Sequence, residues 1–243
     1  MPITAIIKKD KISLSEAEEF QRSLNESAVI LNLGDKLPKE TEKIISLGGD
    51  GTLIACVRNY PGLPILGVNY GSLGFLSAIK KGENPNQEFI AFERGMLSNS
   101  ISKGLALNEI VIARGAVPRS LKLEVYVDDV LLAKYLSDGV IIATSTGSTA
   151  YSLSAGGPIV SPEIESIIIT PICPHFNRNS SFVLPHDSEI KVIVLDSDES
   201  FLTIDGQVSY SIKRDESIEI KYSKNKAKLL YKKDYLFISK LSV

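Results

Sequence analysis

The sequence predicts an α/β N-terminal domain with a parallel, Rossmann-like sheet, followed by an antiparallel β-sandwich C-terminal domain. Through about residue 92, apolar runs of strand length alternate with helical patterns, which is typical of a parallel sheet with right-handed crossovers. Beyond Gly95 the helical patterns give way to short β-rich runs. We therefore expect residues 1–95 to form the α/β domain and residues 96–229 to form the β domain, with the boundary near residues 92–103.

Each element of the first half has a local signal. Ser13 and Glu16 have the spacing of a capping box, and a helical pattern follows them as far as Leu24. A second helix begins at Thr52, and a third is expected over residues 87–94, ending at Gly95. The expected strands cover residues 3–8, 28–31, 44–47 and 64–68.

The second half is predicted to consist of strands and tight turns. Asp205-Gly206 is a strong hairpin signal, and Asp128-Asp129 is a second expected turn. The expected strands cover residues 105–113, 121–127, 130–136, 140–143, 191–195, 201–204, 208–212, 218–222 and 227–231. This succession of short strands indicates a largely antiparallel domain.

The composition is that of an ordinary globular protein. The 243 residues are 44% hydrophobic and 23% charged, and the net charge of −2 gives no reason to expect a nucleic acid or an anionic membrane as partner. No apolar run approaches the roughly 18 residues of a membrane-spanning helix, and the N-terminus lacks the charge order of a signal peptide. Cys56 and Cys173 lie far apart, which favours free thiols and a cytoplasmic location.

The strongest chemical signal is the glycine turn after the strand over residues 44–47. Residues 48–52 (GGDGT) lead from that strand into a helix, an arrangement that binds phosphate through backbone N–H groups and the helix dipole. Asp50 would repel phosphate unless it holds a metal ion or takes a proton. The alternative is a structural Asx turn between strand and helix. A P-loop motif is absent from the sequence.

A second signal is a loop of hydroxyl groups and glycines over residues 146–158. Six of the nine residues 146–154 carry a hydroxyl group, and Gly156-Gly157-Pro158 follows them. Small donors and acceptors at this spacing suit ribose hydroxyls, phosphate oxygens or the edge of a base. The alternative is a turn followed by a capped helix.

Together these segments resemble the NAD kinase family. The matching pieces are residues 48–52, 69–76, 107–109 and 137–158, and the likeness extends from residue 44 to about residue 185 and again over 205–207. GGDGT alone is shared with lipid kinases and phosphofructokinases, whereas its combination with the other pieces is specific. The resemblance agrees with the two-domain fold, and it implies that a C-terminal segment, about 230–243, returns to the N-terminal domain.

The resemblance also implies roles for individual residues. Asp50 is the implied catalytic residue, which accepts the proton of the 2′-hydroxyl on the adenosine ribose of NAD. The implied phosphate-binding residues are Gly48, Gly49, Gly51 and Thr52. The implied substrate-binding residues are Gly51, Phe75, Asn108, Glu109, Arg119, Asp138, Thr149, Ala150, Tyr151, Ser154 and Gln207. Many relatives carry Arg or Lys where this chain has Ala55, so one positive charge for phosphate is missing here.

The implied reaction transfers the γ-phosphoryl group of ATP to the 2′-hydroxyl of NAD and makes NADP. Mg²⁺ or another divalent cation is expected to arrive with ATP, because no metal-binding cluster stands out in the sequence. NAD and ATP are the expected partners, in a homodimer or homotetramer whose dinucleotide site draws on both domains. Two alternatives are a GGDGT kinase that acts on a lipid or a sugar, and a dinucleotide-binding regulator without turnover.

Overall fold

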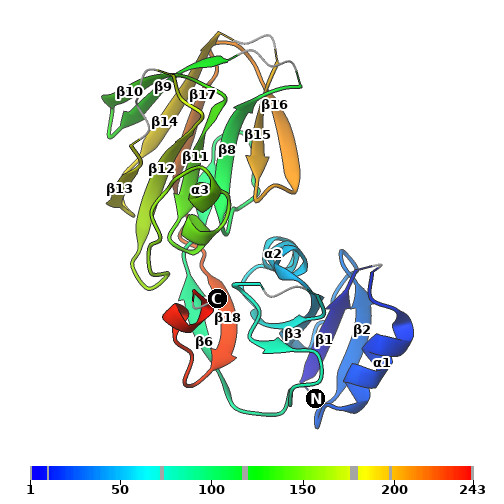
Figure 1. The fold of residues 1–243 in the computed structure, drawn as a ribbon. Coiled ribbons are helices and arrows are strands. Elements are labelled where there is room, and N and C mark those ends of the chain that lie inside the picture. The colour runs from blue at the N-terminus through cyan, green and yellow to red at the C-terminus, as the bar shows by residue number, and fades with distance from the viewer. Residues whose placement is uncertain are drawn as a thin grey trace. The chain divides into compact units, whose positions relative to one another are not determined.

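The chain forms two compact units, each with its own hydrophobic core. The computed structural model describes residues 2–9, 11–71, 74–116, 120–175, 180–196 and 199–241. The first unit consists of residues 1–94 and 225–243, and the second of residues 95–224 (Figure 1). No helix in these described ranges has the length and hydropathy needed to cross a membrane.

The first unit is built on one seven-stranded sheet. Its strand order is β2-β1-β3-β4-β18-β6, and β5 pairs with β4. All of these pairs are parallel except β18 with β6. The strands are β1 (Ile3–Lys8), β2 (Ala28–Asn32), β3 (Thr41–Gly48), β4 (Pro64–Asn69), β5 (Ile79–Lys80), β6 (Phe89–Arg94) and β18 (Ala227–Lys232). The helices are α1 (Leu14–Arg22), α2 (Asp50–Asn59) and the 3-10 helix η2 (Phe237–Lys240).

Local sequence signals explain most of this unit. The predicted capping box at α1 is confirmed: Ser13 Oγ accepts a hydrogen bond from the Glu16 N–H, and Glu16 accepts one from the Ser13 N–H. Ala17 and Phe20 of α1 are buried in the same cluster as Ile45 of β3, so this helix covers one face of the sheet. The central strands are apolar on both faces, as is typical of a buried parallel sheet.

The prediction of a helix over residues 87–94 is wrong. These residues contain β6, which pairs antiparallel with β18 along its whole length. Phe92 of β6 packs edge-on against Tyr231 of β18, with ring centroids 5.6 Å apart. The partner strand lies more than a hundred residues away in sequence, so local pattern alone did not reveal it. Strand β18 itself belongs to the first sheet rather than to the β domain in which we expected residues 227–229.

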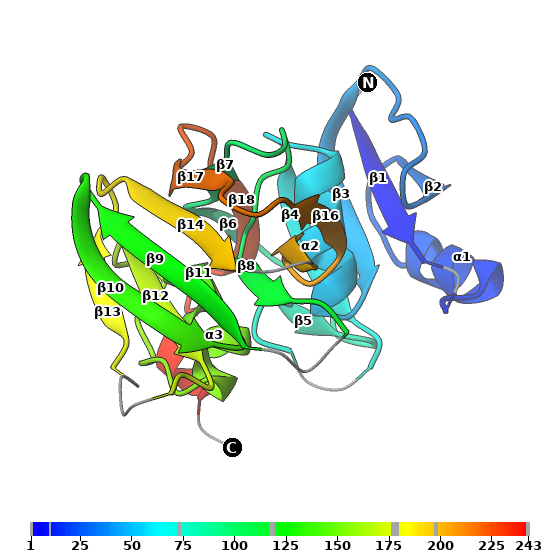
Figure 2. The ribbon, with the colours of Figure 1, turned by 90° about the horizontal axis from the view of Figure 1, so that it is seen from above.

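The second unit consists of two antiparallel sheets. The five-stranded sheet has the order β10-β9-β14-β17-β7, and the six-stranded sheet has the order β13-β12-β11-β8-β15-β16. Figure 2 shows β10, β9 and β14 side by side in the first of these. The strands are β7 (Leu97–Asn99), β8 (Glu109–Arg114), β9 (Leu121–Val127), β10 (Val130–Ser137), β11 (Gly139–Thr144), β12 (Ser166–Ile172), β13 (Phe182–Pro185), β14 (Ile190–Asp196), β15 (Ser200–Ile204), β16 (Val208–Ile212) and β17 (Ser217–Tyr222). Two short helices, η1 (Thr146–Thr149) and α3 (Tyr151–Ser154), follow β11.

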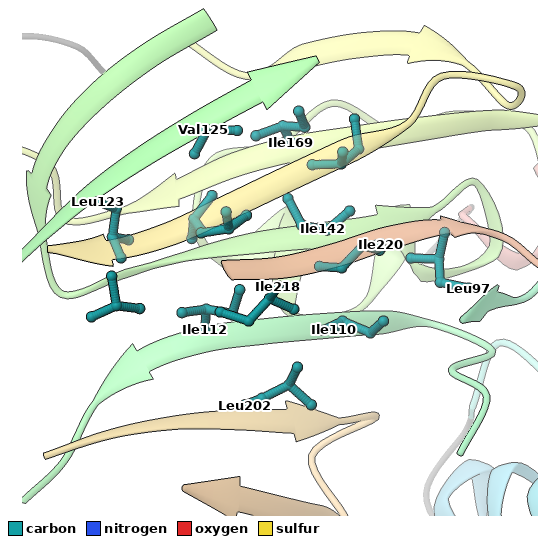
Figure 3. Close-up of a cluster of buried hydrophobic side chains, with 14 of the residues drawn as sticks. Leu97, Ile110, Ile112, Leu123, Val125, Ile142, Ile169, Leu202, Ile218 and Ile220 are labelled. Atoms are coloured by element: carbon teal, nitrogen blue, oxygen red, sulfur yellow. The ribbon is translucent and has the colours of Figure 1, made fainter. Parts of the chain in front are cut away.

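The core of the second unit lies between its two sheets. Leu123 and Val125 of β9 belong to the same buried cluster as Ile110 and Ile142 of the opposite sheet (Figure 3). The expected hairpin turns are confirmed, since Asp128, Asp129, Asp205 and Gly206 all have positive φ. A parallel sheet in one unit and a sandwich of antiparallel sheets in the other confirm the predicted fold class.

Candidate functional site

The Asp50 carboxylate lies at the start of α2 and is held by the loop that follows β4. Its Oδ2 accepts a hydrogen bond of 2.7 Å from the Phe75 N–H, and the Leu76 N–H donates to both oxygens at 3.2 Å. Ser77 Oγ donates to Oδ1 at 3.2 Å. These partners are 25 to 27 residues away in sequence. The carboxylate is therefore oriented by a distant loop, which contradicts the reading of Asp50 as a local Asx turn.

This loop approaches Asp50 so closely that only glycine fits at position 74. A Cβ atom built on Gly74 would overlap all three terminal atoms of the Asp50 carboxylate. Part of the segment 69–76, which carries the family resemblance, is thus a backbone cradle for one side chain. The three donors of the cradle make four contacts with the carboxylate, two on each oxygen, so both oxygens are held by this loop.

A cavity of about 470 Å³ opens beside this carboxylate within the first unit. It lies where the chain leaves the carboxyl ends of β1, β3 and β4. Because β2 and β3 lie on opposite sides of β1, this position is the topological switch point at which open α/β sheets bind ligands. The lining residues are Lys9, Lys11, Ile12, Leu47, Gly48, Gly49, Asp50, Thr52, Tyr70, Gly71 and Gly74.

The cavity has a positive edge that we did not predict as part of the site. Lys9 and Lys11 line it, and neither forms an ion pair with a residue that the structure describes. Gly49 is the N-cap of α2 and lines the cavity, so the positive end of the helix dipole also faces this region. The four predicted phosphate-binding residues belong to the same turn, and three of them (Gly48, Gly49 and Thr52) line the cavity. Two lysines and a helix N-terminus make this cavity suitable for an anion.

In the second unit, a buried corner is formed by Asn108 and Glu109 at the start of β8. Asp205, in the turn between β15 and β16, accepts hydrogen bonds from the N–H groups of Leu107, Asn108 and Glu109 at 2.8 to 3.2 Å. Gly147 packs against the Asn108 carbonyl so tightly that a Cβ atom there would overlap it. The backbone of this corner is therefore fixed from two sides.

Two side-chain oxygens of the corner are buried and available to a ligand. Asn108 Oδ1 and Glu109 Oε2 are buried, and neither has a hydrogen-bond partner among the described residues. Burial, and secondarily the nearby Asp205 carboxylate, raise the pKa of Glu109 to about 8, against the opposing effect of the Tyr151 N–H. The side chain is therefore largely protonated at neutral pH and can both donate and accept a hydrogen bond. Buried polar atoms without partners are uncommon and indicate a site for a ligand.

The hydroxyl groups of residues 146–154 divide into two sets. Ser148 Oγ donates to the Val160 carbonyl at 3.0 Å, and Ser152 Oγ shares a hydrogen bond of 2.9 Å with Thr170 Oγ1. These two hydroxyls are buried and serve the structure, as the turn-and-helix alternative predicts. Their role is to fix the segment onto the six-stranded sheet.

The remaining predicted residues of this segment reach the surface. Tyr151 is 45% exposed, Ser154 is exposed, and Thr149 and Ala150 are half-buried. Since the Tyr151 N–H interacts with Glu109, the structure brings this set next to the Asn108–Glu109 corner.

Of three further predicted residues, one lies away from the corner, one lies in the turn that holds it, and one lies outside the described ranges. Asp138 forms an ion pair of 2.8 Å with Arg114 and immediately precedes β11. Ala143, which pairs with Glu109, lies near the other end of this strand. Asp138 and Ala143 are five residues apart, which corresponds to about 17 Å along a strand, so one chain does not bring Asp138 to the Glu109 corner. Gln207 is in the Asp205 turn, where its N–H donates to the Ile204 carbonyl. Arg119 lies outside the described residues.

Comparison with known proteins decides between the alternatives. Residues 7–94 match the ATP-NAD kinase N-terminal domain, and residues 107–231 match the ATP-NAD kinase C-terminal domain. The chain belongs to the NAD kinase family. An NAD kinase from Acetivibrio thermocellus is 40% identical over 222 residues, which cover 81% of this chain and 77% of that protein.

Two solved structures share the fold over nearly the whole chain. One is an NAD kinase from Archaeoglobus fulgidus in complex with ATP, with a TM-score of 0.85 and 27% identity over 99% of both chains. The other is yeast NADH kinase complexed with NADH, with a TM-score of 0.83 and 26% identity over 99% of this chain and 86% of that one.

As a member of this family the chain is an ATP-dependent NAD kinase, and the matches do not favour a lipid or sugar kinase with the same turn. Sequence reasoning missed Lys9, Lys11, Ser77 and Asp205 as parts of the site. For the two lysines a signal existed, because they follow a predicted strand whose carboxyl end adjoins the glycine turn.

Proposed function

We propose that Asp50 is the catalytic residue that orients the 2′-hydroxyl of NAD and accepts its proton, while ATP supplies the γ-phosphoryl group. The observation that carries this proposal is the cradle of Phe75, Leu76 and Ser77 donors, which fixes the carboxylate beside a cavity with a positive edge. Phosphoryl transfer has a loose transition state, so positioning and neutralisation of charge matter more than base strength. An aspartate fixed in this way suits late acceptance of the proton.

The cavity beside Asp50 is proposed to hold phosphates of ATP. Lys9 and Lys11 would bind phosphate oxygens, together with the glycine turn at the start of α2. Among the described residues, no group of three or more His, Cys, Asp or Glu side chains is placed to hold a metal ion. We therefore propose that Mg²⁺ enters with the triphosphate as part of the substrate, where it neutralises charge on the transferred group.

The Asn108–Glu109 corner is proposed to bind the dinucleotide. Its two unpaired oxygens, together with Thr149, Tyr151 and Ser154 at the nearby surface, suit the hydroxyl and amino groups of a nucleoside. A protonated Glu109 complements a ribose hydroxyl, because each group donates one hydrogen bond and accepts another.

Three further assignments are proposals. A homodimer or homotetramer is supported by the position of Asp138, which lies just before β11 and too far from the Glu109 corner to serve it in its own chain. Contact of Asp138 and Gln207 with the nicotinamide half of a ligand is inferred from the family, as is a ligand-facing position of Arg119. The cytoplasm is the proposed location, and two free cysteines agree with a reducing compartment.

The activity is tested by incubating the pure protein with ATP, Mg²⁺ and NAD and detecting NADP with an NADP-specific dehydrogenase. Parallel reactions with NADH and with polyphosphate define the acceptor and the donor. NAD binding without turnover would instead identify a dinucleotide-binding regulator. Light scattering at the assay concentration tests the oligomer: full activity from a monomer would contradict it.

A further inference from the structure

The C-terminal end of the described chain brings a lysine to the Asp50 site. Helix η2 follows β18 at the end of the first unit (Figure 1). Two apolar residues near Lys240 in sequence are largely exposed, since Leu236 is 69% and Ile238 is 73% exposed. Lys240 is instead half-buried. A lysine that is more buried than its apolar neighbours reverses the usual preference and indicates that the ammonium group has a specific position.

That position is defined by the cradle of Asp50. Lys240 Nζ donates a hydrogen bond of 2.9 Å to the Ser77 carbonyl, across 163 residues of sequence. Ser77 is itself 4% exposed, and its Oγ donates to Asp50 Oδ1 at 3.2 Å. One residue therefore connects the ammonium group to the carboxylate.

The charges around Lys240 include an electrostatic interaction with the Asp50 carboxylate. Burial lowers the pKa of Lys240, and the strongest opposing influence is the Asp50 carboxylate; Lys80 and Lys232 lower it further, and Glu83 opposes them. Glu83 is already engaged by Lys232, with 2.7 Å between Oε2 and Nζ. Asp50 is therefore the main negative charge that favours the ammonium form of Lys240.

We propose that Lys240 is a positioning residue of the active site: through Ser77 it holds the loop that cradles Asp50. The catalytic consequence rests on the proposed role of Asp50, whereas the effect of Lys240 on the loop does not.

Three variants separate this role from simple anchoring of the chain end. Lys240→Met removes the charge and the donor but keeps most of the length, and Lys240→Arg keeps both the charge and a donor. Lys233→Met is the matched control, because Lys233 is an exposed lysine in the turn after β18 of the same segment. Each variant is measured for kcat, for KM of NAD and ATP, and for hydrogen exchange at the Phe75 and Leu76 amides.

We expect Lys240→Met to lower kcat by roughly 10- to 100-fold, as for a small misplacement of a catalytic group, with KM for NAD changed less than about threefold. The amides of Phe75 and Leu76 should lose protection, whereas Lys240→Arg should restore most of both properties. The Lys233→Met control should match the wild type in every measurement.

Unchanged protection of the Phe75 and Leu76 amides in Lys240→Met would overturn the proposal, whether or not the protein turns over NAD. The proposal would also be contradicted if Lys240→Arg restored the protection of both amides but had the same kcat as Lys240→Met. If the wild type lacks NAD kinase activity, the proposed function fails, and the exchange data still decide whether Lys240 holds the loop.

Discussion

The Asp50 carboxylate accepts its shortest hydrogen bond, 2.7 Å, from the backbone N–H of Phe75, a residue 25 positions further along the chain. A backbone donor cannot rotate away as a side chain can, so the carboxylate is fixed by the path of the loop after β4. The orientation of the candidate catalytic group is therefore a property of backbone geometry at residues 74–77.

Substitution at Gly74 tests this dependence. In Gly74→Ala, the new Cβ would overlap the Asp50 carboxylate and displace either the loop or the side chain. We expect kcat to fall by roughly 100-fold, as for other small misplacements of reacting groups, with a melting temperature close to that of the wild type. Lys39→Ala is the control, because Lys39 is exposed and precedes β3 at the end of the strand away from Asp50. Equal kcat values for the two alanine variants would argue against the cradle.

The lysines of the cavity should matter for ATP and not for NAD. Charge-assisted hydrogen bonds to phosphate are worth about 1.5–3 kcal/mol, so Lys9→Met combined with Lys11→Met should raise KM for ATP at least roughly tenfold. Lys39→Met serves as the control, since Lys39 is exposed and precedes β3 at the opposite end of the strand. Steady-state kinetics with each substrate varied in turn makes the comparison. An increase in KM for NAD alone would place the phosphates of ATP elsewhere.

Glu109 should make the folded state less stable as the pH rises. Its pKa is about 8 in the folded protein and near 4.5 when unperturbed, so between these values the folded state binds more protons than the unfolded state. The free energy of unfolding then decreases with increasing pH, by an amount on the order of a few kcal/mol across the whole window.

Glu109→Gln tests this sign, because glutamine has the shape of the protonated carboxyl group. The free energy of unfolding in urea should decrease more in the wild type than in the variant when the pH rises from about 5 to about 8.5. Taking the difference between the two proteins removes the contribution of the other titrating groups. The same pH dependence in both would mean that Glu109 is ionised in the folded protein.

Most of the strands could be predicted from the sequence, because local patterns of apolar residues indicate which strands are buried. Residues 121–127 and 208–212 form strands with the predicted bounds, and Asp205-Gly206 forms the predicted turn. Two errors arose where pairing partners lie far apart in sequence. Strand β6 was expected to be a helix, and the first three residues of its partner β18, 227–229, were expected in the other domain. Neither segment carries a local signal for a partner more than a hundred residues away.

The candidate site shows the same division. Asp50 and Asn108–Glu109 were found from motifs and from the family resemblance, whereas the residues that hold them were not. Ser77 and Lys240 are unremarkable in sequence, and their importance depends on contacts across 27 and 163 residues. Among the hydroxyl groups of residues 146–154, sequence could not separate the buried Ser148 and Ser152 from the exposed Tyr151. The exposed fraction of each side chain in the structure separates these two sets.

The variant Asp50→Asn decides whether Asp50 accepts the proton of the 2′-hydroxyl. Asparagine keeps the shape and one acceptor oxygen but cannot take up the proton. We expect kcat for NAD phosphorylation to fall on the order of 10²–10⁴-fold, the usual contribution of a general base. Calorimetry should show that NAD binding changes little, because an amide oxygen still accepts a hydrogen bond from a hydroxyl group. Turnover within a few-fold of the wild type in a correctly folded Asp50→Asn variant would contradict this account of the reaction.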